Sequence, residues 1–67
     1  MTIDHAQHNY DQALATYQQA DKALYSAEGA HFTADTAHVY VAIREAWIAA
    51  VDAVEAAEKA LHLAHGL

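Results

Sequence analysis

The chain has 67 residues, no cysteine and a formal net charge of −6, with 3 Lys and Arg against 9 Asp and Glu. A chain of this size forms at most one domain, residues 1–67, and buries only about 60% of the surface that its unfolded form exposes. The missing cysteines exclude disulfides and zinc–thiolate sites, and the few basic residues argue against nucleic acid or an anionic membrane as a partner.

The composition favours helix throughout. Eighteen residues are Ala, the strongest helix former, and the chain has no Pro and only two glycines, Gly29 and Gly66. No apolar run approaches the roughly 20 residues that span a bilayer, and no secretory signal follows Met1. We therefore expect an all-α, cytoplasmic protein.

The first helix is predicted over about 3–28. Two rows recur at seven-residue spacing in this segment, one large and one small: Ile3, Tyr10, Tyr17 and Leu24, then Ala6, Ala13, Ala20 and Ala27. Leu14 and Tyr25 widen this apolar stripe. Such a pattern is typical of a helix that packs along one seam against another helix.

A turn is predicted over about 29–32. The seven-residue rows slip by two positions across this segment, and Gly29 is the type of residue that ends a helix. Thr33 is a good N-cap residue, and Asp35 would lie favourably in the first turn of the helix that follows. One unbroken long helix is the alternative.

The second helix is predicted over about 33–65 and repeats the two rows: Tyr40, Trp47, Val54 and Leu61, then Ile43, Ala50, Ala57 and Ala64. Val41, Ile48 and Val51 extend its apolar side beyond what one partner helix covers. A helix that is apolar nearly all round is normally buried. We therefore expect antiparallel hairpins that associate as a four-helix bundle or a larger helical oligomer, similar in outline to the small plasmid-encoded RNA-binding proteins that are dimers of helical hairpins. A basic face for RNA is absent, so their function is not expected here.

The expected contact between copies lies on the second helix. If two such helices meet antiparallel about an axis near residues 49–50, residue i of one copy faces a residue close to 99 minus i of the other. Arg44 then faces Glu55, and two ion pairs flank the apolar patch, although an intrachain contact to Glu45 or a solvated Arg44 is equally compatible with the sequence. The predicted interface is Val41, Arg44, Trp47, Ile48, Val51 and Glu55.

Histidines concentrate near the two ends of the chain, which a hairpin brings together. The candidate metal ligands are Glu58, His62, His65, His5 and His8. Imidazole with carboxylate suits a divalent transition metal. Solvated surface histidines are the alternative, and they need no cofactor.

The functional expectation is therefore a non-enzymatic, acidic helical protein that self-assembles and binds another protein, such as an adaptor, a regulator or a phage-type inhibitor. A metal-binding or metal-storage hairpin is the alternative function. No catalytic motif is present: Ser26 is the only Ser, and no Gly-rich phosphate loop exists.

Overall fold

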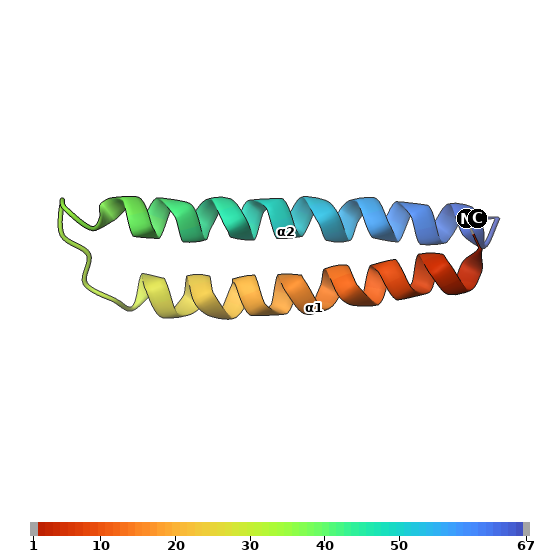
Figure 1. Cartoon of the computed structure of the whole chain (residues 1–67), viewed down its shortest axis with the longest axis horizontal. Coiled ribbons are helices and arrows are strands. Elements are labelled where there is room, and N and C mark those ends of the chain that lie inside the picture. Colours follow the sequence, from red (N-terminus) through yellow and green to blue (C-terminus); the bar gives the residue numbers. More distant parts are fainter. Residues whose placement is uncertain (1, 67) are drawn as a thin grey trace.

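The computed structural model describes residues 2–66 and shows two helices, α1 (Ile3–Glu28) and α2 (Ala37–Ala64). They run side by side in opposite directions, and the connection between them lies at one end of the molecule (Figure 1). The predicted all-helical hairpin is confirmed, and the unbroken long helix is wrong. No helix within residues 2–66 is both long and apolar enough to cross a membrane.

The first helix begins where the sequence places it. The side chain of Thr2 accepts a hydrogen bond from the backbone N–H of His5 at 3.1 Å, which satisfies one of the free donors of the first turn. Asp4 adds a negative charge there, where the helix dipole favours it.

The end of α1 differs from the expectation for Gly29. Gly29 has a φ of −85°, so it keeps a right-handed conformation and does not use the left-handed region that glycine alone enters easily. A Cβ at this position would meet only the Ser26 carbonyl oxygen, at 3.7 Å. The turn therefore forms here without needing a glycine.

The start of α2 is a correction to the predicted boundary. The helix begins at Ala37 and not at Thr33, because Thr33 and Thr36 close a separate turn between them. The Thr33 backbone N–H donates to the Thr36 hydroxyl at 3.0 Å, and the Thr36 N–H donates to the Thr33 carbonyl at 3.1 Å. Thr33 is therefore not the N-cap, and Asp35 lies in the connecting turn.

The contact between the helices follows the predicted rows. Ala6, Ala27 and Ala50 are the buried residues of the described chain, and most of the larger row members beside them are half-buried. Ile3, at the end of its row, is 46% exposed. No large side chain within residues 2–66 is fully buried, so the hairpin has a seam but no core of its own.

The molecule is a rod. It measures 49 × 14 × 13 Å, and its radius of gyration is 15.2 Å. A compact domain of 67 residues would have a radius of gyration of about 11 Å. Two helices that lie side by side cannot enclose an interior, which explains why so little of the apolar surface is buried.

Candidate interaction surface

Trp47 is the centre of the contact between α1 and α2. Its ring lies 6.3 Å from that of Tyr17, measured between centroids, with the planes tilted by 43°. Its indole Nε1 donates a hydrogen bond to the Asp21 carboxylate at 3.2 Å. Trp47 was predicted both in the large row of α2 and in the contact between copies; Tyr17 and Asp21, its contacts here, both lie on α1 of the same chain.

A hollow of about 340 Å³ opens beside Trp47. Both helices contribute to its wall, which is formed by Leu14, Tyr17, Trp47, Val51, Val54 and Glu55. Glu55 is the one charged member of this wall, and the others are apolar or aromatic. The hollow therefore fits an apolar side chain with a positive group next to it.

Exposed apolar side chains continue from this hollow along α2. Ile48 is 45% exposed and Val41 is 49% exposed, although isoleucine and valine are normally found inside proteins. Arg44, one turn from both, is exposed, as is Glu55. Together with half-buried Val51, these residues place five of the six predicted interface residues at or near the surface of α2.

The same side of the hairpin is also hollowed near the turn. Phe32 packs against Tyr40 with ring centroids 5.8 Å apart, which covers that end of the seam. A shallow hollow there includes Glu28 of α1 and Val41 of α2 in its wall. Val41, one of the predicted interface residues, therefore shares this hollow with the carboxylate of Glu28.

The other side of α2 consists mainly of small side chains. It carries exposed Val39 and Leu63 at its ends and small residues between them: Ala42, Ala46, Ala49, Ala53 and Ala56. Because Ala buries little area, this side offers a partner less than the side that carries Ile48 and the hollow.

The candidate metal ligands are not gathered into one set. Among residues 2–66, no group of three or more His, Asp and Glu side chains is placed to hold a metal ion. Glu58 and His62 do share the wall of one shallow hollow on α2, but Lys59 lies there too, and a positive charge disfavours a bound cation. His5, His8 and His65 are exposed and are not part of this wall.

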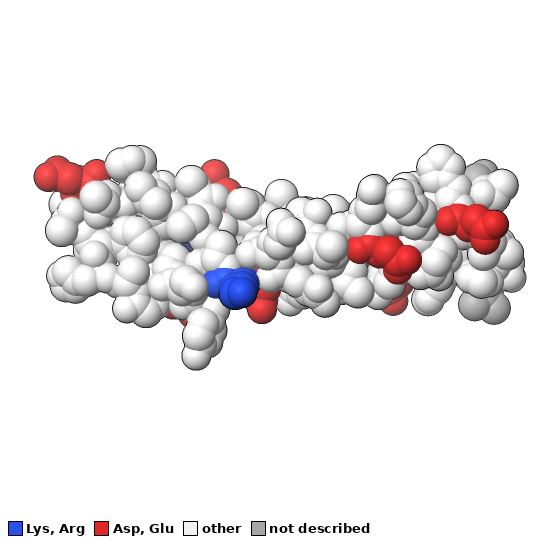
Figure 2. All heavy atoms as spheres, turned by 60° about the horizontal axis from the view of Figure 1, so that its bottom comes forward, with Lys and Arg blue, Asp and Glu red and all other residues white. Residues whose placement is uncertain are grey.

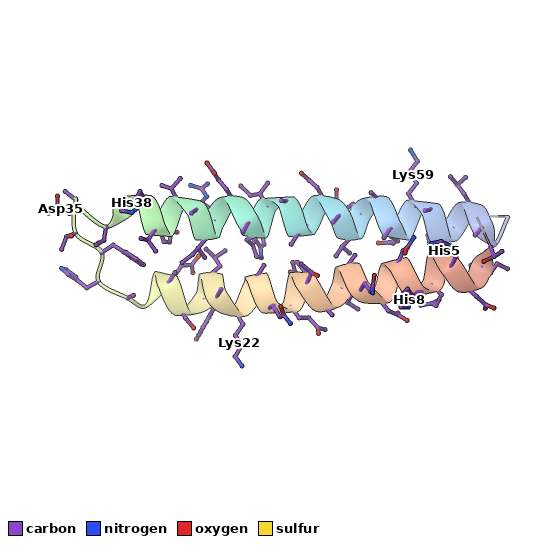
Figure 3. All side chains as sticks on the ribbon, viewed as in Figure 1. His5, His8, Lys22, Asp35, His38 and Lys59 are labelled. Carbon is purple, nitrogen blue, oxygen red and sulfur yellow. The ribbon has the colours of Figure 1, made fainter. Side chains whose placement is uncertain are left out.

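The labelled side chains show how widely the charged and imidazole groups are spread (Figure 3). His5 and His8 lie near the start of α1, whereas His38 and Asp35 lie at the opposite end of the hairpin. Lys22 and Lys59 point away from the helix pair on opposite sides. Figure 2 shows acidic side chains at separate points along the rod, with uncharged surface between them.

Sequence reasoning missed Asp21 and the hollow beside Trp47. Asp21 precedes Leu24 of the large row by three residues, which places it at the edge of the seam within reach of an indole N–H. Leu14 was noticed only as a widening of the apolar stripe. The signal for the hollow was the widening of the apolar stripe at Leu14, which lies beside the large row and lines the hollow.

Comparison of the chain with protein-family models, with curated proteins and with solved structures finds no match.

Proposed function

We propose that this protein is a non-enzymatic assembly module: copies associate through the exposed apolar side of α2, and the resulting acidic helical bundle binds another protein. The rod exposes 4985 Å² of surface, about 800 Å² more than a compact monomer of 7.3 kDa, which has about 4200 Å². A standard protein interface buries about 800 Å² on each partner. This excess is the observation that carries the proposal.

The side of α2 that would be covered is set by its side chains. Val41, Ile48 and Val51 offer apolar area. Arg44 and Glu55 lie one turn before Ile48 and one turn after Val51, and Val41 lies one turn before Arg44. With an axis near residues 49–50, each Arg44 faces the Glu55 of the other copy. Two antiparallel hairpins joined in this way form a four-helix bundle.

We propose a non-enzymatic role because the described surface of the rod lacks the buried polar groups and deep clefts that are typical of catalytic sites. Within residues 2–66 no polar or charged side chain is buried. Catalytic groups are usually tuned by burial next to a charged partner. The hollows on the rod are shallow and lie over exposed helix surface, which suits contact with a protein.

The proposed partner is a protein with a basic contact surface. The chain carries a net charge of −6, and Asp4 and Asp11 stand exposed on α1, seven residues apart on one side of that helix. Opposite charge on the partner would guide its approach and orientation more than it would raise affinity.

A charge-reversal pair tests the proposed association. Arg44→Glu places two carboxylates opposite each other at each end of the patch, so we expect a weaker dimer. Adding Glu55→Arg restores opposite charges and should recover most of the loss. A rim pair contributes about 0.2–1 kcal/mol, so loss of the two pairs together raises Kd by about 2- to 30-fold.

Sedimentation velocity over a concentration series measures these changes. Glu45→Arg is the matched control, since it reverses an exposed charge beside Arg44 on a different side of α2. If the double reversal associates no better than Arg44→Glu alone, the proposed axis is wrong.

The partner is tested by affinity capture from the organism that makes the protein. We compare the unmodified chain with an Asp4→Asn, Asp11→Asn variant, which keeps the helix but removes two charges. A polypeptide retained by the first and lost by the second supports a basic partner. Equal retention by both argues against recognition through these carboxylates.

A further inference from the structure

We infer that the hollow beside Trp47 is the docking site for α2 of a second copy, whose Ile48 and Val51 fill it while its Arg44 pairs with Glu55 on the rim. This inference rests on the proposed self-association. It adds the site on each copy, the hollow beside Trp47, to which the other copy binds.

The chemistry of the hollow specifies its occupant. Its wall is apolar or aromatic at five positions and carboxylate at one, Glu55. An occupant needs an apolar side chain and, about one helical turn away, a positive charge. Arg44 is the only Arg in the chain, and Ile48, which follows it by four residues on α2, is exposed. Residues four apart lie on the same side of a helix.

The positions of these residues along two antiparallel α2 helices agree with docking of Ile48 and Arg44 at the hollow. The α2 residues in the wall are Trp47, Val51, Val54 and Glu55. In an antiparallel pair with its axis near residues 49–50, Ile48 of the second copy stands level with Val51, and Val51 of the second copy stands level with Ile48. Its Arg44 then stands level with Glu55. The apolar groups reach the middle of the hollow and the positive group reaches its one carboxylate.

The arrangement is reciprocal, as a two-fold axis requires. Each copy offers the same hollow and the same Arg44, Ile48 and Val51, so both hollows are filled by one contact. Leu14 belongs to α1, yet it lines the hollow. Association would therefore involve both helices of each hairpin, and the contact would extend beyond a single helix pair.

Disulfide trapping tests this docking directly, because the chain has no cysteine of its own. We mix the single variants Ile48→Cys and Val51→Cys and oxidise them slowly. Residues level with each other in the pair lie near enough for a disulfide, which needs Cα atoms within about 7 Å. We expect a covalent dimer that contains one copy of each variant, identified by mass after separation under denaturing conditions.

The matched control is a mixture of Ala46→Cys with Ala53→Cys, two residues that the same axis places level with each other but that lie on the other side of α2. This mixture should remain unlinked under the same conditions. If it is linked and the first mixture is not, copies meet through the Ala-rich side and the inference is overturned. If neither is linked although the unmodified chain sediments as a dimer, the hollow is not the docking site, but self-association stands.

The cysteine variants are also examined in their reduced form. Weaker but still measurable association of Ile48→Cys and Val51→Cys, with Ala46→Cys and Ala53→Cys associating like the unmodified chain, supports docking at the hollow, because only the first pair removes apolar atoms from it. An unmodified chain that sediments as a monomer at every concentration overturns the proposed function and this inference together.

Leu14→Ala is a second test that leaves α2 unchanged. It removes part of the α1 wall of the hollow, so we expect weaker association with little loss of helix. Ala15→Ser, the next residue along α1 and exposed, is the control and should leave association unchanged. Equal association of Leu14→Ala and the unmodified chain would show that the hollow is not filled by the second copy.

Discussion

Ile48→Ala gives the sharpest quantitative prediction. Burying an isoleucine side chain completely contributes about 1.5–3 kcal/mol. Ile48 is 45% exposed in the single chain, so association would bury the remaining part and contribute about 0.7–1.4 kcal/mol per copy. In a symmetric dimer both copies make this contribution, so the dimer loses about 1.4–2.7 kcal/mol in the Ile48→Ala variant. This loss corresponds to roughly a 10- to 100-fold increase in the dissociation constant Kd.

The assay is sedimentation velocity across a dilution series, with circular dichroism on the same samples. Ala favours helix more than Ile does, so helix content in the variant should not fall for local reasons. Val39→Ala is the control, because Val39 is 41% exposed on the opposite side of α2 and loses apolar atoms in the same way. A change in Kd below about three-fold for Ile48→Ala, or an equal change for Val39→Ala, would refute the reasoning about this side of α2.

Three further substitutions test the hairpin itself. Gly29→Ala should raise the free energy of unfolding by about 0.4–1 kcal/mol, because the φ of −85° suits alanine and the unfolded chain loses freedom; a decrease in melting temperature at fixed concentration would contradict this account of the turn. Trp47→Phe removes the hydrogen bond to Asp21 and should lower the free energy of unfolding by about 1 kcal/mol in urea titration. Asp21→Asn keeps an acceptor oxygen and should cost less than Trp47→Phe, and the opposite order would show that the bond contributes little.

Much of the hairpin could be predicted from the spacing of its side chains. The seven-residue rows through Tyr17 and Ala50 place the seam correctly, because only one side of a helix can face a single neighbour. The end of α1 at Glu28 was also predicted, since the rows lose their phase at Gly29.

The details that were missed depend on hydrogen bonds between particular atoms. Thr33 is a residue type that often caps the start of a helix. Here its backbone N–H donates a hydrogen bond to the Thr36 hydroxyl, and the helix begins four residues later. The row through Trp47 places this residue in the seam, but the pattern does not show that its indole N–H donates to the Asp21 carboxylate. Spacing along one helix specifies a side of that helix, but it does not give the depth of the space between two helices.

The histidines show the same limit. The spacing of His62 and His65 placed them near Glu58, and a hairpin does bring their end of α2 near the start of α1. A metal site also requires side chains that converge on one point. Within residues 2–66 no such convergence occurs, because these histidines stand on exposed sides of their helices.

The single hairpin leaves exposed the apolar side of α2 that we propose a second copy covers. Sedimentation equilibrium of the unmodified chain, from low concentration to the highest at which it remains in solution, is the direct test of this association. We expect the apparent mass to rise from the 7.3 kDa of one chain to a whole multiple of it, with twice that mass as the first step. A mass of one chain over the whole range would contradict the proposed association.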